Sequence, residues 1–336
     1  MSKTIDLTNK TVLISRTDSI GDVVLTLPTC VWIKQQFPSC KLIFLGNTYT
    51  KPVISCVSAI DKILCWKDFE NLPTIEKIQK ISNEKIDVCL HIFPKKEVAS
   101  LMKKAKIKDR IGTSHRAFHL LTCNHRLNFS RKKSDLHEAQ LNFELLKPIG
   151  LNEIPSLNEI SEMLSKAFKK PQINLNPEFS ELKNAVILHP KSQGSALEWP
   201  LEKYKLLAEK LLEKGKTVVF TGTENEGKLF RDFIPTQENC HDLTGKMTLE
   251  ELIVFISQSE SLVACSTGPL HLAGILGIKT IGLFSSRKPI HPGRWKALGT
   301  NVFPLEFDSN CEICHKGKHC SCIQKIEVDK VLEILA

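Results

Sequence analysis

The sequence lacks a long apolar run and an apolar N-terminal segment. No stretch of its 336 residues approaches the roughly 20 consecutive apolar residues of a membrane-spanning helix. The first residues, Met1-Ser-Lys-Thr-Ile-Asp6, contain no apolar signal core, so we expect no export. With 42% hydrophobic and 25% charged residues, the composition is that of a globular protein long enough for two domains. The sequence therefore predicts a cytoplasmic protein.

Acidic residues are scarce in the first 150 positions. This part holds 24 Lys and Arg against 14 Asp and Glu, or +10; since the whole chain has 46 and 37, the remainder has 22 and 23, or −1. Residues 91–133 alone carry twelve basic side chains against Glu97 and Asp109. Such a field suits an anionic partner, either a phosphorylated glycolipid, a membrane surface or a nucleic acid. A solvated lysine-rich surface is the alternative.

Two binding classes find little support in the sequence. No Gly-x-Gly-x-x-Gly follows an expected strand, which argues against a dinucleotide-dependent dehydrogenase. Phe118 and Phe129 provide little of the aromatic interleaving that nucleic-acid binding would favour. Nucleic acid is therefore the least favoured anionic partner.

The 12 cysteines fall into two groups. Eight are scattered singly, mostly in apolar surroundings, and are predicted to be buried thiols of a reducing compartment. The other four lie close together near the C-terminus and are Cys311, Cys314, Cys320 and Cys322. Cys-x-x-Cys is a usual zinc half-site, whereas Cys-x-Cys is tighter than the usual second half. A structural zinc site and a disulfide both remain open.

The stretch 262–277 is predicted to form a strand, a tight turn and a helix. Leu262–Cys265 is a short apolar run, Ser266 and Thr267 offer N-cap hydroxyls, and Pro269 suits a first helical turn. Gly277 suits the residue just beyond the helix end. Such a turn directs backbone N–H groups and the positive end of a helix toward one point, which favours an anion. An ordinary βαβ unit without a ligand is the alternative.

A second strand and turn open the chain. Thr11–Ser15 is β-rich, and Arg16-Thr-Asp-Ser-Ile-Gly-Asp22 follows it before a helix candidate over 23–34 that contains Pro28. Gly21 allows a tight turn or close backbone approach. Asp22 stands at a helix start, where the helix dipole favours a carboxylate. Local pattern alone makes it a helix cap.

Strand and helix patterns alternate along the rest of the chain, which predicts α/β domains with parallel sheets. Expected strands include 41–45, 63–65, 87–92, 111–116, 185–188, 216–222 and 280–284, with 111–116 at a sheet edge. Helices are expected over 137–146, 201–214 and 326–335. The polar, proline-punctuated stretch 148–177 is predicted to link two domains, residues 1–170 and 171–336.

Four ordered motifs resemble glycosyltransferase family 9, the bacterial heptosyltransferases of lipopolysaccharide core assembly. The family pattern Arg-x-x-x-x-Gly-Asp, followed by a Pro, is matched by Arg16, Gly21, Asp22 and Pro28. The pattern His-Glu-x-x-x-Asn is matched from His137 to Asn142. In the C-terminal half, the pattern Met-x-Leu-Glu is matched from Met247, and Asp-Thr-Gly-x-x-His is matched by Thr267, Gly268 and His271, with Ser266 replacing the Asp.

The resemblance implies a GT-B fold, in which two Rossmann-like domains face each other across a cleft. Residues 1–170 would bind the acceptor and residues 171–336 the nucleotide sugar. Asp22 would be the catalytic base, with Arg16, Gly21 and His137 at the acceptor. The residues implied for the donor are Ser192, Glu226, Met247, Ser266, Thr267, Gly268 and His271. The alternatives are purely structural roles: a helix cap for Glu226, core packing for Met247 and a surface helix start for His137.

One departure from the family pattern concerns the donor's diphosphate. The family loop closes with Lys-x-Trp-Pro, and here Trp199 and Pro200 match while Leu197 occupies the lysine position. Lys191 or Lys246 is a candidate replacement, as are backbone N–H groups together with Ser192.

The function implied is an inverting glycosyltransferase that requires no metal or other cofactor. It would move a heptose from ADP-heptose onto the lipopolysaccharide inner core, a glycolipid acceptor, in peripheral contact with the anionic surface of the inner membrane. The similar cysteine-rich segments of the family imply no catalytic metal. Two alternatives remain, a family 9 transferase for a different nucleotide sugar and a basic binding protein without catalysis.

Overall fold

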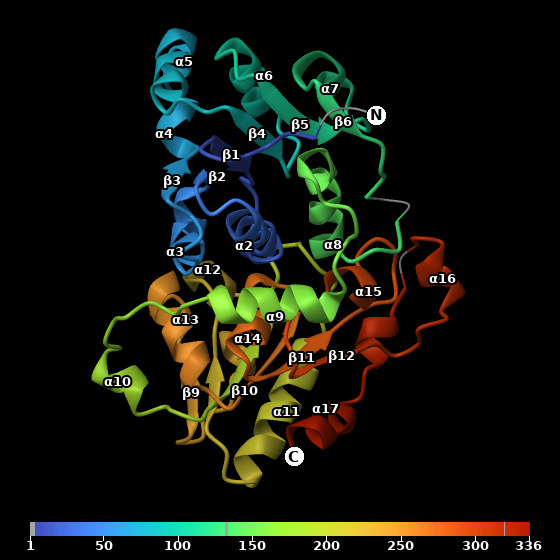
Figure 1. Ribbon diagram of the computed structural model, residues 1–336. Helices are drawn as coiled ribbons and strands as arrows, with labels where there is room; N and C mark the ends of the chain where they lie inside the picture. The colour runs from blue at the N-terminus through green and yellow to red at the C-terminus, as the bar shows by residue number, and fades with distance from the viewer. Residues whose placement is uncertain (1–3, 132–133, 319) are drawn as a thin grey trace. The chain divides into compact units, whose positions relative to one another are not determined.

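The computed structural model describes residues 4–131, 134–318 and 320–336. Lys132 and Lys133, which belong to the basic stretch 91–133 of the sequence analysis, lie outside the described residues. The chain divides into two compact units, Met1–Lys169 and Lys170–Ala336, called here the N-terminal and the C-terminal unit. Each unit contains one six-stranded sheet surrounded by helices (Figure 1). The predicted α/β class is confirmed.

The N-terminal sheet is parallel throughout and has the order β3-β2-β1-β4-β5-β6. Its strands are β1 (Thr11–Ser15), β2 (Lys41–Gly46), β3 (Lys62–Cys65), β4 (Val88–His91), β5 (Asp109–Thr113) and β6 (His125–Leu127). The three-residue strand β6 pairs outside β5, so the strand predicted at 111–116 is internal and not at the edge. The central strand β1 is almost entirely buried, which explains its continuous apolar sequence.

Helices of the N-terminal unit cover this sheet. They are α1 (Ile20–Val24), α2 (Leu27–Gln36), α3 (Lys51–Ser55), α4 (Lys67–Glu70), α5 (Thr74–Asn83), α6 (Lys96–Lys104), α7 (Ala117–Thr122), α8 (Glu138–Phe143) and α9 (Leu157–Ala167), with 3-10 turns η1 (Thr48–Thr50) and η2 (Glu144–Ile149). The helix predicted over 23–34 is divided in two. Pro28 falls in the first turn of α2, where its missing N–H leaves no hydrogen bond unmade.

The C-terminal sheet is also parallel and has the order β12-β11-β10-β7-β8-β9. Its strands are β7 (Val186–His189), β8 (Val218–Phe220), β9 (Cys240–Asp242), β10 (Ser261–Cys265), β11 (Lys279–Leu283) and β12 (Val302–Leu305). Alternate residues of these strands, such as Val263 and Cys265, face a buried core shared with helices α11 and α17.

The helices of the C-terminal unit are α10 (Pro177–Ser180), α11 (Leu201–Glu213), α12 (Glu224–Gly227), α13 (Leu249–Gln258), α14 (Gly268–Leu276), α15 (Pro292–Trp295), α16 (Glu312–His315) and α17 (Val328–Leu335), with 3-10 turns η3 (Arg231–Phe233) and η4 (Cys322–Lys325). The strand, turn and helix predicted over 262–277 are confirmed as β10 and α14. Gly277 ends α14 with φ of 83°, a left-handed conformation that glycine adopts readily.

Both sheets reverse their strand order at one point. In the N-terminal unit this point lies between β1 and β4, and in the C-terminal unit it lies between β7 and β10. Loops that leave the carboxyl ends of two such strands run in opposite directions, which opens a crevice where α/β proteins bind ligands. Among the described residues, no helix is both long and apolar enough to cross a bilayer.

Candidate active site

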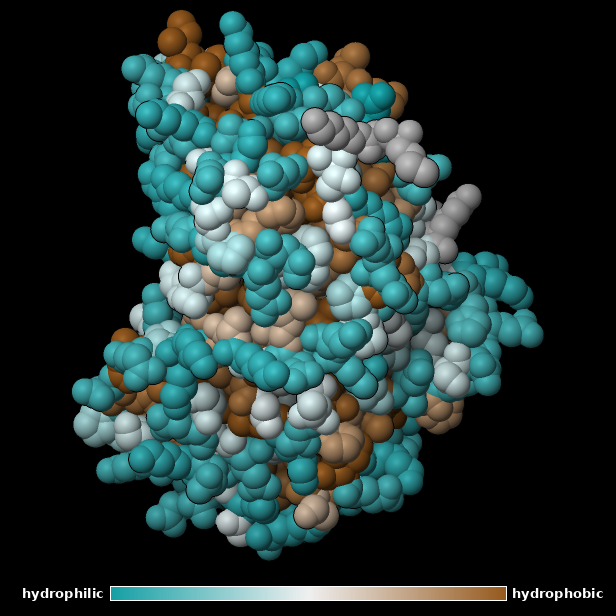
Figure 2. All heavy atoms as spheres, in the orientation of Figure 1, coloured by the Kyte–Doolittle hydropathy of each residue, from teal (hydrophilic) through white to brown (hydrophobic). Residues whose placement is uncertain are grey.

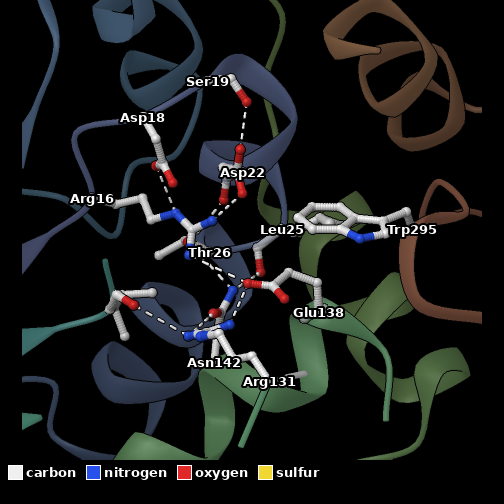
Figure 3. A network of polar contacts seen from close by, with 12 residues as sticks. Arg16, Asp18, Ser19, Asp22, Leu25, Thr26, Arg131, Glu138, Asn142 and Trp295 are labelled. Carbon is white, nitrogen blue, oxygen red and sulfur yellow. Dashed lines mark hydrogen bonds and ion pairs between the residues drawn. The ribbon is translucent and has the colours of Figure 1, made fainter. Parts of the chain in front are cut away.

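A buried guanidinium lies just beyond the carboxyl end of β1. Arg16 is 3% exposed and forms ion pairs with Asp18, at 2.7 Å from Nε to Oδ1, and with Asp22 through Nη2. Figure 3 shows the two carboxylates on either side of Arg16. The three residues come from one loop and the first turn of α1, because β1 ends at Ser15 and the helix begins only at Ile20. The sequence-predicted residues Arg16 and Asp22 are therefore in direct contact.

Asp22 is the more accessible partner of this pair. Its carboxylate is 18% exposed, accepts a hydrogen bond from the Ser19 hydroxyl and contacts Arg16 through the other oxygen. Gly21, next to it, is buried within α1. The tight turn expected at Gly21 is instead the beginning of a helix, since the chain becomes helical from Ile20. Asp22 thus is a fixed carboxylate with one side open to solvent.

A second layer of charge supports Arg16 from helix α8. Glu138, 2% exposed, has Oε1 at 3.5 Å from Arg16 Nη1 and is also paired with Arg131. Arg131 donates to Asn142 Oδ1 at 3.0 Å, and Asn142 Nδ2 donates to the Leu25 carbonyl at 2.9 Å. The network therefore joins α8 to the segment that follows β1.

His137 caps this helix. Its Nδ1 accepts the Ala139 N–H at 3.2 Å, and its own N–H donates to Gln140 Oε1 at 3.3 Å. Its side chain is buried, not on a surface helix start, and it precedes the Glu138 that reaches Arg16. His137 therefore belongs to the same buried region as the Arg16 network.

Burial and neighbouring charges shift two pKa values in this network. Burial by itself lowers the pKa of Arg16, but the carboxylates of Asp18, Asp22 and Glu138 outweigh it and hold that pKa above its ordinary value. Burial raises the pKa of Asp18 from 3.8 to about 6, against the opposing effect of Arg16. Arg16 therefore remains a cation, while Asp18 titrates in the mildly acidic range.

In the C-terminal unit, an uncharged turn follows β10. Thr267 is the N-cap residue of α14, yet its hydroxyl makes no capping hydrogen bond. Thr267 Oγ1 is buried and has no hydrogen-bond partner among the described residues. His271, in the first turn of α14, is also buried, and its N–H donates to the Thr267 carbonyl at 3.4 Å. With Ser266 and Gly268, this turn presents a helix N-terminus at the strand-order reversal.

The loop after β7 lies against that turn. Ser195 Oγ donates to the Ser266 carbonyl at 3.3 Å, which joins the two loops at the strand-order reversal. Ser192 donates through both its backbone N–H and its hydroxyl to Glu198 Oε1, each at 2.8 Å. The other oxygen of Glu198 pairs with Lys191. Ser195, and not Ser192, makes the contact with the turn after β10, while Ser192 is held by Glu198 within its own loop.

Leu197 and the two candidate lysines have different surroundings. Leu197 packs against the hydrophobic core of this unit, so an apolar side chain suits its position. Lys191 lies next to Ser192 and is 20% exposed, whereas Lys246 is 51% exposed and lies 4.0 Å from Glu178. Of the two, Lys191 is in the loop that closes with Trp199 and Pro200.

Glu226 and Met247 follow the neighbouring strands β8 and β9. Glu226 Oε2 accepts from Thr223 N–H at 2.7 Å and from Thr223 Oγ1 at 2.8 Å, a capping box at the start of α12. Burial lowers the pKa of His189, at the end of β7, and Glu226 and Glu198 act in the opposite direction. Met247 is half-buried and precedes the predicted capping box of Thr248 and Glu251, which is confirmed.

Four cysteine sulfurs converge elsewhere in this unit. Those of Cys311, Cys314, Cys320 and Cys322 all lie within 4.8 Å of one another, a donor set that can hold a metal ion. None of the four cysteines is in a disulfide.

Comparison with known proteins decides the family. The sequence model of glycosyltransferase family 9 (heptosyltransferase) matches residues 75–322. The chain belongs to glycosyltransferase family 9. As a member of family 9, it is an enzyme of glycosyl transfer from a nucleotide sugar, and its fold is GT-B.

Relatives of this family 9 chain are distant, and several of them match over nearly its full length. Lipooligosaccharide heptosyltransferase 2 of Campylobacter jejuni is 21% identical, over 94% of this chain and 93% of that protein. The structure of a family 9 glycosyltransferase from Veillonella parvula superposes with a TM-score of 0.77 at 18% identity, covering 99% of both chains. ADP-heptose lps heptosyltransferase II of E. coli gives 0.72 at 16% identity, covering 97% of both. These structures establish the fold.

Sequence reasoning about this family 9 chain missed the partners that hold Arg16. Glu138 lies in the helix predicted over 137–146, but nothing in that pattern indicates that it pairs with Arg16. Arg131 belongs to the basic stretch 91–133, whose composition does not indicate its pairing with Glu138. Asp18 lies between Arg16 and Asp22 in the sequence but outside the family pattern, so its ion pair with Arg16 is not predicted. The available signal was the concentration of ionisable residues around two strand ends, but their pairing depends on which strands are neighbours.

Proposed function

We propose that this chain transfers a heptose from ADP-heptose to the lipopolysaccharide inner core, with inversion at the anomeric carbon and without a metal ion. Family membership and the likeness to the ADP-heptose lps heptosyltransferase II support the donor and the acceptor class. The observation that carries the proposal is the turn after β10, where the buried Thr267 hydroxyl has no hydrogen-bond partner among the described residues. A phosphate oxygen of the donor would supply that partner.

In the N-terminal unit, the proposed base is Asp22. The acceptor hydroxyl attacks the anomeric carbon and its proton passes to the Asp22 carboxylate. The new bond joins the acceptor oxygen to the anomeric carbon, while the bond to the diphosphate oxygen breaks and the diphosphate leaves with the electron pair. Arg16 and Ser19 fix the orientation of Asp22 for this step. Arg16, Gly21 and His137 are the residues proposed for the acceptor.

In the C-terminal unit, the proposed donor residues stabilise the leaving diphosphate. Backbone N–H groups at Gly268 and the start of α14 face developing negative charge without moving, as electrostatic preorganisation requires. Ser266, Thr267 and His271 complete that turn, and Ser192 lies in the adjoining loop. Lys191 is proposed to supply the cation that Leu197 cannot. Glu226 and Met247 are proposed for the ribose and the adenine.

Calorimetric titration of the purified protein with ADP, UDP and GDP tests the donor, with and without an added divalent metal. We expect ADP to bind most tightly, to bind equally well without the metal, and to bind more weakly to Glu226→Ala. Binding of none of the three, together with salt-dependent binding of DNA or RNA, would instead favour a basic binding protein.

A different nucleotide sugar is the second candidate, and it rests on the donor loops themselves. Leu197 is committed to the core, and Ser266 stands where the family pattern has Asp. Tighter binding of UDP or GDP than of ADP in the same titration would retain the family and replace the donor.

We also infer that helix α7 and its surroundings contact the anionic surface of the inner membrane on its cytoplasmic face. Leu120 and Leu121 are 57% and 74% exposed, and Figure 2 shows an apolar patch over this helix, bordered by hydrophilic residues. The exposed basic residues on α6, on β6 and on the loops next to α6 and α7 are Lys103, Lys104, Lys106, Lys108, Arg116 and Arg126. Exposed apolar side chains together with exposed basic residues on neighbouring elements suit an anionic bilayer surface.

Sedimentation with vesicles tests this contact. The protein should pellet with phosphatidylglycerol vesicles and not with phosphatidylcholine vesicles, and Leu120→Ser with Leu121→Ser should abolish pelleting. Ile75→Ser is the matched control, because Ile75 is 79% exposed but lies on α5. Equal loss in both variants would exclude a specific role for α7.

A further inference from the structure

The four cysteines near the C-terminus form one compact cluster of sulfur atoms. Cys311 Sγ lies 3.6 Å from Cys320 Sγ, which lies 3.0 Å from Cys322 Sγ, and all four sulfurs are within 4.8 Å of one another. Four thiolates at about 2.3 Å from one tetrahedral ion stand about 3.8 Å apart. The observed spread brackets that distance, so one ion could bind all four sulfurs after small side-chain adjustments.

The local backbone presents these sulfurs to a common centre. Cys311 is the N-cap residue of α16, and Cys314 lies three positions later on the same side of that turn. The His315 N–H donates to the Cys311 carbonyl at 3.0 Å, and Gly317 then reverses the chain with φ of 71°. Cys322 opens the 3-10 turn η4. One short helical turn therefore supplies Cys311 and Cys314, and the start of η4 with the residues just before it supplies Cys322 and Cys320.

The segment that carries the cluster has almost no hydrophobic core. Between residues 306 and 318, Cys314 is the only buried side chain, and even Phe307 and Ile313 are 51% exposed. Small loop-rich segments of this kind usually depend on a metal ion or a disulfide for their order. In contrast, six of the eight cysteines outside the cluster are buried singly within the two units.

We propose that Cys311, Cys314, Cys320 and Cys322 bind one structural metal ion as four thiolates, and that the ion is Zn²⁺. Four sulfur donors in a tetrahedral set favour zinc or iron over harder metals, and zinc requires no change of oxidation state. The four thiols release four protons to solvent as the ion binds, and no oxidant or reductant is consumed. None of the four cysteines is among the residues proposed for sugar transfer, and the metal ion would take no part in that reaction.

The ion would order the segment against the loop that follows β11. Ser285 Oγ lies 3.6 Å from Cys314 Sγ, and Arg287 Nε donates to the Gly317 carbonyl at 3.0 Å. On the other side, η4 leads to Ile326, whose carbonyl accepts from Trp199 Nε1 at 3.0 Å. The site thus connects the end of the C-terminal sheet to the core beneath α11 and α17.

Elemental analysis of the full-length protein, purified under reducing conditions, tests the proposal. We expect about one zinc per chain. Cys314→Ser and Cys322→Ser should reduce the metal content to near zero, whereas Cys65→Ser and Cys240→Ser, at part-exposed single cysteines, should retain it. One iron per chain would retain the four-thiolate site and overturn the choice of zinc.

A second measurement covers the case in which the serine variants fail to fold. Removal of the metal from the wild-type protein by a chelator should lower the midpoint of thermal unfolding by about 5–10 °C, and added Zn²⁺ should restore it. Co²⁺ added in its place should give the thiolate-to-metal absorption of a four-sulfur site. Metal-free protein with four titratable thiols or with disulfides among these cysteines would overturn the proposal.

Discussion

The two units share a strand order but differ in charge where that order reverses. At the end of β1, a buried guanidinium is surrounded by the carboxylates of Asp18, Asp22 and Glu138, and a second cation, Arg131, stands behind them. At the end of β10, the chain passes through Ser266 and Thr267 into α14, with no Asp, Glu, Lys or Arg in the turn. The same strand order therefore carries a network of charges in one unit and a turn of hydroxyl and glycine residues in the other, and we propose that the two bind different ligands.

Under the proposed function, the two strand ends have different tasks in the reaction. A carboxylate that must accept a proton needs a fixed orientation, and in the N-terminal unit a network of buried charges provides it. A leaving diphosphate brings its own negative charge, and in the C-terminal unit we propose that it meets backbone N–H groups and the Thr267 hydroxyl, which has no hydrogen-bond partner within the described part of the chain. Variants in the two units should therefore fail in different ways.

The largest effect is expected from Asp22→Asn. Loss of the base should lower kcat by about 10²–10⁴-fold, while the affinity for ADP, which the C-terminal unit is proposed to bind, stays unchanged. Steady-state assays together with calorimetry separate the two quantities. Asp68→Asn is the matched control, since Asp68 is an exposed carboxylate in the first turn of another short helix, α4. Near-full activity of a folded Asp22→Asn protein would show that Asp22 is not the base.

Glu138→Gln should give the largest loss of stability. Removal of this buried carboxylate leaves Arg131 and Arg16 without a shared counter-charge, which costs about 3–5 kcal/mol of unfolding free energy. Glu198→Gln makes the same chemical change at a pair with Lys191 that is 27% exposed, and should cost about 1 kcal/mol or less. Urea unfolding measures both. Equal losses would contradict the contrast between a buried and an accessible network.

The segment after β10 could be predicted from the sequence more completely than the segment after β1. The turn after β10 could be predicted because its strand, caps and helix are contiguous from Leu262 to Gly277. The Arg16 network could not, because Glu138 and Arg131 meet Arg16 only after the sheet and α8 are in place. The sequence does not predict β6, β9 or β12, because these short edge strands lack an apolar run: β6 and β9 contain charged or polar residues, and Pro304 interrupts β12.

A smaller effect on the free energy of unfolding is expected from the raised pKa of Asp18. The pKa of its carboxyl group is 3.8 in the unfolded chain and about 6 in the folded protein. Between pH 3.8 and about 6, Asp18 is therefore protonated in the folded protein and ionised in the unfolded chain. Its stabilising contribution is present below pH 3.8 and is lost as the pH rises to about 6. Asp18→Asn, which remains neutral, should gain stability relative to the wild type over that range, by at most about 3 kcal/mol. Urea unfolding at a series of pH values measures this difference. If the free energy of unfolding changes with pH in the same way in both proteins, Asp18 does not titrate as described.

The smallest and most selective effect is expected from Thr267→Val. Because the Thr267 hydroxyl has no hydrogen-bond partner among the described residues, its replacement by a methyl group of similar size should leave stability unchanged or slightly raised. The affinity for ADP should fall by about tenfold, since one hydrogen bond to a charged phosphate is lost. Thr244→Val is the control for stability, because the Thr244 hydroxyl donates to Asp242 Oδ1 at 2.6 Å and its loss should destabilise the unit. If Thr267→Val unfolds as readily as Thr244→Val and binds ADP normally, the hydroxyl serves the fold and not the donor.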